Sequence, residues 1–235
     1  MKQSIATVLA LLCCLTSMAQ WTKPAQPASQ PLAEGEQVYL YNADADGFWL
    51  GANDWKTRAS VSATRGYKMH VAQYVPVEGA QWDGVSYMIM TTIEDGTPAG
   101  KTLPAKLSDW NSIWVDALED NTDDKGWVFK AQGDGTYIIG LSPLNQKFNP
   151  QEDLQNACLG IMPEMKDTRV YLCQEGDGGY DFTTCKKRWS FVKESDYNTY
   201  VVAVNQYNAA VILGEEIAKA KVSFPSVDIS RVEAI

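Results

Sequence analysis

The sequence predicts an all-β domain that is followed by a C-terminal helical segment. Val38–Gly51 contains two short runs of alternating apolar residues on either side of a polar turn, which is typical of a half-buried β-hairpin. The same apolar spacing recurs in Trp127–Gly140, and a shorter copy begins at Trp189. Turn residues occur about every ten residues, which favours a sandwich or a barrel. After Lys193 the apolar spacing changes to the helical period of about 3.6 residues.

Composition limits the classes of partner. The chain has 235 residues, a formal net charge of -9 and an isoelectric point near 4.7. Because nucleic acid and anionic lipid are themselves negative, we expect neither as a partner. Eight tryptophans and eleven tyrosines are many for this length. Most of them are expected in the core or half-buried on strands, and a minority are expected to stack against a flat ligand such as a sugar.

Residues 1–19 have the three parts of a signal peptide. Lys2 supplies a positive charge, and Ile5–Thr16 is an apolar run too short to span a bilayer. Ser17–Ala19 supplies small residues before a cleavage that leaves Gln20 as the first residue. We therefore expect an exported protein, in the periplasm, at the cell surface or outside the cell, with no membrane insertion after cleavage.

Export permits a disulfide in the mature chain, whose cysteines are Cys158, Cys173 and Cys185. Cys173 and Cys185 bracket a turn-rich segment, so hairpin geometry favours them as the pair. Three buried free thiols are an equal alternative, because spacing alone does not establish the approach that a disulfide needs. A lipoprotein anchor at Cys13 is disfavoured because Leu12, rather than a small residue, precedes it.

The remaining elements lie between clusters of turn residues. Residues 20–35 are rich in Pro, Ala and Gln, have no periodicity and are expected to form a linker. Loops are expected at 116–125, which is acidic, and at 144–155. Besides the two hairpins, the expected strands are Ala59–Val61, Tyr67–Val77, Val85–Ile93, Ile113–Ala117, Cys158–Met162, Val170–Cys173, Tyr180–Thr184 and Trp189–Val192.

The repeats share one motif. Each opens with a Trp-x-Phe or Val-x-Leu strand, turns, and returns as an aromatic residue, any residue, an aliphatic residue and Gly. Over residues 36–193 this motif resembles a β-trefoil of the ricin-B-like kind. The resemblance implies a β-trefoil-like barrel that the third copy, Trp189–Phe191, closes against the first hairpin, and it implies carbohydrate binding. The Gln-x-Trp signature of that family does not occur in this sequence.

Residues 194–235 are predicted to be a helical segment. Ser195 is placed to cap a helix, and apolar residues continue at helical spacing from Tyr197 through Val211 and on toward Lys221. Thr199–Val204 also aligns with a strand of the second repeat, but the helical pattern runs for some twenty residues and helix is favoured. A loop with Pro225 is expected next, and then the start of a second helix at 228–230.

The tail is similar to the small helical-bundle repeats that follow such trefoils in large bacterial surface proteins. A lone helix of a bundle leaves an apolar face uncovered. We therefore expect the sequence to be the N-terminal piece of a longer protein, with a truncated bundle at its end, or a protein that docks this helix onto a protein partner.

No motif compels a chemistry, so we expect neither an enzyme nor a cofactor. Asn42–Gly47 has the alternating oxygen ligands and the Gly of a calcium loop, with Asn53 at the twelfth position, but turn chemistry alone explains these residues and is favoured. His70 is the only histidine, and its apolar neighbours indicate an ordinary strand residue. Cysteine and histidine do not occur at a zinc spacing, and the acidic run 116–124 is favoured as a solvated loop.

Two clusters combine tryptophan with polar side chains, as a sugar site needs. Strand alternation should turn Trp49 outward, since Phe48 and Leu50 are expected to face inward. Packing at the rim of the core is the alternative for both clusters. The candidate ligand-binding residues are Trp49, Asn53, Asp54, Trp55, Asp109, Trp110 and Trp114.

Three functions follow, in order of preference. The first is a non-catalytic exported binding module, with a glycan as its ligand. The second is a structural spacer or protein-docking domain of a larger bacterial surface protein, with the C-terminal helix as its interface. The third is a hydrolase that acts through carboxylates, whose acids would come from distant positions in the chain.

Overall fold

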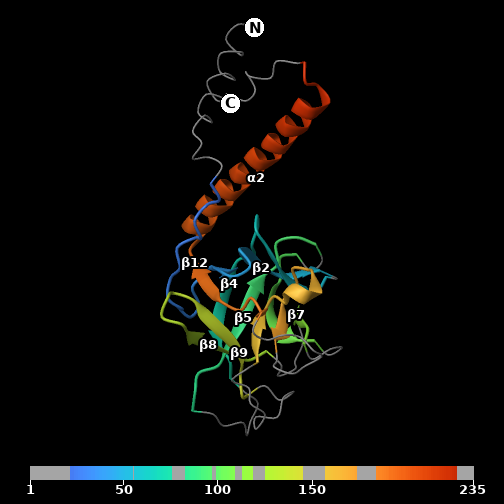
Figure 1. Ribbon diagram of the computed structural model, residues 1–235. Coiled ribbons are helices and arrows are strands. Elements are labelled where there is room, and N and C mark those ends of the chain that lie inside the picture. Colours follow the sequence, from blue (N-terminus) through green and yellow to red (C-terminus); the bar gives the residue numbers. More distant parts are fainter. Residues whose placement is uncertain are drawn as a thin grey trace. The chain divides into compact units, whose positions relative to one another are not determined.

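The computed structural model describes residues 22–54, 56–75, 83–96, 99–108, 113–118, 125–144, 157–173 and 184–226. These residues form twelve strands, a short 3-10 helix η3 (Pro163–Met165) and a long helix α2 (Glu194–Ser223), which are shown in Figure 1. The chain is therefore mostly β with a C-terminal helix, as the sequence predicts. The strands are β1 (Tyr39–Asn42), β2 (Gly47–Asp54), β3 (Arg58–Ser62), β4 (Met69–Gln73), β5 (Tyr87–Thr92), β6 (Thr102–Leu107), β7 (Val115–Ala117), β8 (Trp127–Ala131), β9 (Tyr137–Leu141), β10 (Cys158–Gly160), β11 (Tyr171–Cys173) and β12 (Trp189–Val192).

Antiparallel pairing joins all twelve strands and closes nine of them into a ring. The ring closes where β12 pairs with β1, with Tyr39 opposite Val192, so the predicted pairing of the third repeat with the first hairpin is confirmed. A single bridge from Val38 to Met69 also joins β1 to β4, which defines a shorter ring of β1, β4, β5, β8, β9 and β12.

The other six strands form three hairpins, β2–β3, β6–β7 and β10–β11. The hairpins also meet one another in pairs. Arg58 of β3 lies opposite Asp116 of β7, and isolated bridges join Trp114 to Tyr171 and Ser60 to Arg169. The chain thus contains three successive four-strand units, each with two ring strands and one hairpin.

The structural repeat differs in phase from the repeat expected from the sequence. Trp127 and Trp189 begin the fourth strands of the second and third units, and their counterpart in the first unit is Met69, which begins β4. Each tryptophan donates its indole N–H to a carbonyl of its own unit, Trp127 to Ala105 at 2.9 Å and Trp189 to Leu159 at 2.8 Å. The hairpin β1–β2 lies within the first unit, whereas β8–β9 joins the second unit to the third, so the two are not equivalent. The sequence suggested that they were, because hairpins with the same apolar period look alike whichever strands they join.

Strand β6 was not expected from the sequence. Pro104 interrupts the apolar run and Lys106 follows two residues later, so the segment lacks the composition of a strand. Lys106 is nevertheless fully buried. The other strands in the described residues were predicted, with ends that differ by a few residues; the one expected at Tyr180–Thr184 lies almost wholly outside them.

The segment expected to be a linker lies extended along the β unit from Gln26 onward. Gln30 N–H donates to Phe191 O at 2.9 Å, and Leu32 N–H donates to Tyr137 Oη at 3.0 Å. Gly35 N–H donates to a carbonyl of β4 at 2.9 Å. Both polar atoms of the Gln30 carboxamide are buried without a hydrogen-bond partner in the described part of the chain.

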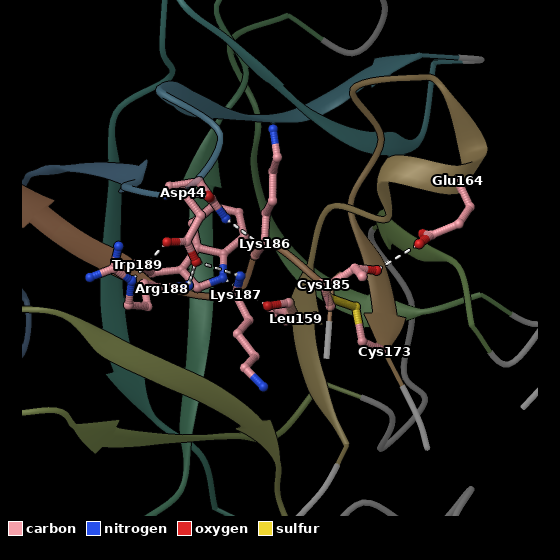
Figure 2. The surroundings of a disulfide bond; sticks show 11 residues. Asp44, Leu159, Glu164, Cys173, Cys185, Lys186, Lys187, Arg188 and Trp189 are labelled. Carbon is pink, nitrogen blue, oxygen red and sulfur yellow. Dashed lines mark hydrogen bonds and ion pairs between the residues drawn. A yellow bond between two sulfur atoms is a disulfide. The ribbon is translucent and has the colours of Figure 1, made fainter. Parts of the chain in front are cut away.

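The predicted disulfide between Cys173 and Cys185 is confirmed, with Cα atoms 6.7 Å apart (Figure 2). It fixes the segment before β12 to the end of β11. Close by, Thr184 Oγ1 donates to Glu164 Oε1 at 2.6 Å. Cys158 is a buried free thiol.

The tail is a helix, as favoured, and Thr199–Val204 is helical rather than extended. It begins at Glu194, so the prediction that Ser195 caps it is wrong; the carbonyl of Lys193 already accepts the bond from Tyr197 N–H at 2.9 Å. The first turn belongs to the compact unit of residues 26–198, whereas residues from Thr199 onward belong to a second unit.

The first helical turn is fixed to the β unit by an aromatic stack. The ring of Tyr197 lies parallel to that of Tyr39, with centroids 3.6 Å apart, and meets Phe48 edge-on. Its hydroxyl accepts a bond from Gly66 N–H at 3.0 Å. The helix then ends at Ser223, the residue at which the loop was expected to begin, and the second helix expected at 228–230 lies outside the described residues. No helix in the described ranges is long and apolar enough to span a membrane.

Candidate functional site

Trp49 does not face outward. Its side chain is 0% exposed, its indole N–H donates to Thr91 Oγ1 at 2.8 Å, and its ring meets Trp189 edge-on at 6.0 Å. A ring in this position is unavailable to a ligand, so the prediction that Trp49 lines an exposed site is wrong.

The alternation argument failed because β2 is covered on both faces. Trp49 lies in the large core cluster inside the ring, whereas Leu50 belongs to a second cluster with Tyr67, Ile93 and neighbouring apolar side chains. The alternation of side chains along a strand indicates which residues share a face of the sheet. It does not indicate whether the opposite face is exposed to solvent.

The remaining predicted residues of the first cluster lie at the end of β2. Asn53 is exposed and makes two contacts: Nδ2 donates to Ser60 Oγ at 2.9 Å, and Oδ1 accepts from Arg65 Nη2 at 2.6 Å. The backbone of Asp54 pairs with Arg58 in the last step of the β2–β3 ladder. Trp55 lies outside the described residues.

In the second cluster, Trp114 is half-buried, and its ring face is already occupied. The Arg58 guanidinium carbon lies 3.5 Å from the Trp114 ring centroid. Arg58 and Asp116 form a buried ion pair, with 3.5 Å between Nε and Oδ1. Trp114 therefore packs over this pair, as the rim-packing alternative has it, while Asp109 and Trp110 lie outside the described residues.

A hollow of about 520 Å³ opens beside the hairpin β2–β3. Leu50 and Val61 supply apolar surface, and Asn53 places its carboxamide at the same opening. The wall also carries hydroxyl, carboxylate and guanidinium groups. The polar side chains that line the hollow are Asp46, Asn53, Ser62, Thr64, Arg65 and Thr168.

A chain of hydrogen bonds holds Arg65 at the edge of this hollow. Its guanidinium donates to Asn53 and to the Asp95 carboxylate, which also accepts a bond from the Tyr67 hydroxyl. The Tyr67 bond, and then Arg65, lower the pKa of Asp95. Burial and the same bond raise the pKa of Tyr67 to about 12. The network keeps Asp95 ionised and Arg65 oriented.

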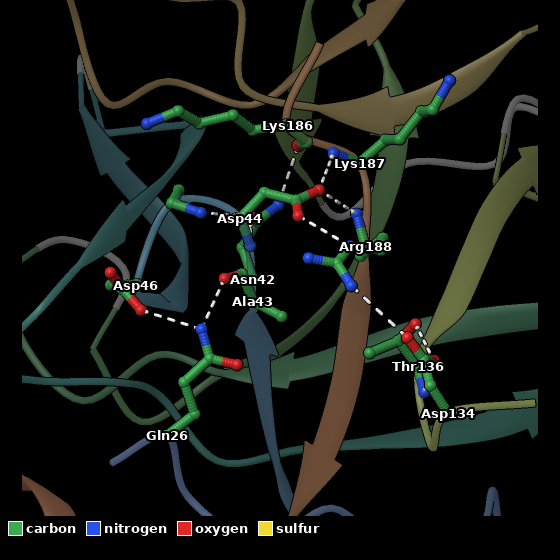
Figure 3. A network of polar contacts seen from close by, with 11 residues as sticks. Gln26, Asn42, Ala43, Asp44, Asp46, Asp134, Thr136, Lys186, Lys187 and Arg188 are labelled. Carbon is green, nitrogen blue, oxygen red and sulfur yellow. Dashed lines mark hydrogen bonds and ion pairs between the residues drawn. The ribbon is translucent and has the colours of Figure 1, made fainter. Parts of the chain in front are cut away.

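Polar atoms of the Asn42–Gly47 turn form hydrogen bonds with other groups of the protein (Figure 3). Asn42 Oδ1 accepts from the backbone N–H groups of Asp44 and Ala45, as an Asx turn does. The Asp44 carboxylate accepts from Lys187 N–H, Arg188 N–H and Arg188 Nε, at 2.7–3.0 Å. These oxygens are the ones that a calcium loop would present, and here they join the turn to the segment before β12.

In the described ranges, no cluster of three or more His, Cys, Asp or Glu side chains that could hold a metal ion occurs. His70 is half-buried on β4, with Nδ1 3.1 Å from the Gln37 carboxamide nitrogen. The expectation that the acidic run is a solvated loop is wrong for Asp116, which is buried on β7 beside Arg58, and most of the run after it lies outside the described residues.

Comparison with known proteins finds distant structural matches only. No family model and no curated protein match the chain. A structure of type II water soluble Chl binding proteins is 11% identical, over 72% of this chain and 99% of that chain, with a TM-score of 0.46. A Kunitz type trypsin inhibitor from Cicer arietinum is 14% identical, over 72% of this chain and 99% of that one, with a TM-score of 0.44. The binding domain of botulinum neurotoxin serotype D is 10% identical, over 76% of this chain and 47% of that one, with a TM-score of 0.44. At these scores the matches identify neither a family nor a ligand for this chain.

Proposed function

We propose that this chain is an exported, non-catalytic carbohydrate-binding module built on a β-trefoil. The fold proposal is supported by the three four-strand units, by the six-strand ring and by the three hairpins that meet in pairs. The indole bonds of Trp127 and Trp189, each to a carbonyl of its own unit, support the same threefold repeat. Export rests on the signal peptide of residues 1–19.

The observation that supports the function is the polar hollow beside β2–β3. Sugar hydroxyls both donate and accept hydrogen bonds. The hollow offers a guanidinium donor in Arg65, hydroxyls in Ser62 and Thr64, and the carboxylate of Asp46, whose Oδ1 already accepts bonds from Gln26 and Tyr41. Arg65 is pre-oriented by its bonds to Asn53 and Asp95, which lowers the entropy cost of binding.

Trp55 remains the proposed stacking residue. In the chain it comes one residue after β2, whose end carries Asn53 at the hollow. Changing Trp55 to Ala should weaken glycan binding without unfolding the domain. Asp109 and Trp110 remain a second, weaker proposal, because the neighbouring ring of Trp114 is covered by Arg58.

The test is a glycan-array screen of the mature chain, with and without calcium, followed by calorimetry on two variants. Thr64→Val removes a lining hydroxyl with little change in shape, and Thr102→Val makes the same change on the exposed start of β6, away from the hollow. Loss of one polar contact should weaken binding roughly tenfold in Thr64→Val. Equal affinities of both variants and the parent would remove the hollow from the site, and silence on the array would reject the glycan proposal.

A protein-docking role is the second candidate, and one observation favours it. The helix α2 and the turn after it expose large apolar side chains to solvent, of which Ile212, Val222 and Phe224 are each at least 60% exposed. Exposed apolar surface of this kind marks contact sites. Concentration-dependent self-association, measured by analytical ultracentrifugation and abolished by Ile212→Glu, would support this role.

A further inference from the structure

The free thiol of Cys158 lies directly opposite a disulfide cysteine. In the antiparallel ladder of β10 and β11, the Cα partner of Cys158 is Cys173. Opposed residues in such a ladder project to the same face, with Cβ atoms about 4.5–5.5 Å apart. Cα atoms of opposed residues are about 4.5–5.5 Å apart as well, which is within the Cα range that a disulfide spans, and closing the bond would draw the two Cβ atoms together to about 3.5–4.5 Å.

The disulfide leans over the same strand. A Cβ atom placed on Gly160 would lie 2.3 Å from Cys185 Sγ and 3.1 Å from Cys173 Sγ, so only glycine fits beneath this bond. Gly160 and Cys158 share a face of β10, since they are two residues apart. All three cysteines accordingly belong to one buried apolar cluster, with Met162 and Tyr171.

We propose that Cys173 can form either of two disulfides, one with Cys185 and one with Cys158, and that Cys158 replaces Cys185 in this bond by thiol–disulfide exchange. The Cys158 thiol first loses its proton to solvent; the thiolate attacks Cys173 Sγ, the Cys158–Cys173 bond forms, the Cys173–Cys185 bond breaks, and Cys185 leaves as a thiolate that takes up a proton from solvent. The exchange needs no external oxidant or reductant, because one disulfide and one thiol are present before and after it.

The buried environment slows this exchange at neutral pH. Burial raises the pKa of the Cys158 thiol to about 12, and the positive charge of Lys187 lowers it only partly. Only the thiolate attacks, so the rate should rise about tenfold per pH unit below that pKa.

The exchange would change what holds the segment before β12. Cys185 is followed directly by Lys186–Arg188. The backbone N–H groups of Lys187 and Arg188 and the Arg188 guanidinium donate to the Asp44 carboxylate in the β1–β2 turn, and Lys186 O accepts from the Asn42 carboxamide (Figure 3). In the present pairing this segment is covalently tied to β11. In the alternative pairing it would be held only by noncovalent contacts, such as the hydrogen bond from Lys186 N–H to Ile161 O, 2.9 Å long, and the ion pair of Arg188 with Asp44.

The test maps disulfides in the mature chain, residues 20–235, after incubation at pH 8.5 without denaturant; this chain lacks Cys13 and Cys14 and so holds three cysteines. N-ethylmaleimide traps free thiols, and peptide mass spectrometry finds the linked pair. We expect a Cys158–Cys173 peptide that grows with time together with alkylated Cys185, and neither in a Cys158→Ala control. In a second measurement, Cys185→Ala in a glutathione redox buffer should form the same Cys158–Cys173 bond and lose the mass of two hydrogen atoms. Absence of that linked peptide from both samples would overturn the proposal.

Discussion

The effect of Trp49→Ala on stability distinguishes a buried Trp49 ring from an exposed one. If its ring faced solvent, Trp49→Ala would leave stability nearly unchanged and reduce sugar binding. In the structure the ring is fully buried, packs against Trp189 and hydrogen-bonds Thr91. The substitution should therefore destabilise the whole β unit.

The magnitude follows from burial and from the hydrogen bond. Replacing a buried tryptophan by alanine costs about 3–5 kcal/mol in lost transfer energy and cavity formation. The lost bond adds about 1 kcal/mol, and it leaves the hydroxyl of Thr91, which is 0% exposed, without its partner. A total of about 4–6 kcal/mol is a large share of the 5–15 kcal/mol that is typical for a domain.

The assay is urea denaturation followed by circular dichroism, which is less affected than fluorescence by the loss of one indole. Thr102→Val, at an exposed position where the 3.1 Å hydrogen bond to the Thr92 hydroxyl is lost, serves as the control and should cost no more than about 1 kcal/mol. A free energy of unfolding for Trp49→Ala within about 1 kcal/mol of the parent would refute the buried placement.

Three further predictions concern other parts of the β unit. Asp116→Ala should lower the free energy of unfolding by about 3–5 kcal/mol, because it leaves the buried Arg58 charge unpaired. The double substitution Arg58→Met/Asp116→Leu should lower it by less, and a double-mutant cycle measured by urea denaturation would show the difference. Because the pKa of Tyr67 is raised to about 12, its contribution to stability is complete below pH 10 and is lost as the pH rises from 10 to 12. Tyr67→Phe should make the loss of stability in this window shallower, with the remaining slope due to Tyr39, Tyr171 and Tyr197, whose pKa values are also raised; an unchanged curve would contradict the assignment. Gln30→Met should raise the free energy of unfolding by about 1 kcal/mol or more, since it removes two buried polar atoms without partners, and a lower value would show that the carboxamide is satisfied.

Only part of the proposed site could be predicted from the sequence. Asn53 was a candidate because it follows an apolar strand, and it does line the hollow. Arg65 was not a candidate, since a lone arginine in a loop carries no pattern. Its position beside Asn53 arises from the return of the chain between β3 and β4, at an angle that no local spacing encodes.

The sequence by itself determined the local elements. Alternation with turn residues predicted the hairpins, the bracketed turn favoured Cys173 and Cys185 as the bonded pair, and the sustained 3.6-residue period predicted the helix after Lys193. Each of these features depends on interactions between residues that are close in the chain, so each leaves a periodic or spacing signal.

The tertiary structure alone decided which surfaces are covered and which strands are equivalent. Trp49 is buried because the ring of strands closes around it, and residues 26–35 lie on the β unit although their composition is that of a linker. Trp127 and Trp189 occupy equivalent positions in the second and third units, and Met69 occupies that position in the first unit. Burial and equivalence depend on contacts between residues far apart in the chain, and a period of two in one strand is the same whichever neighbour covers it.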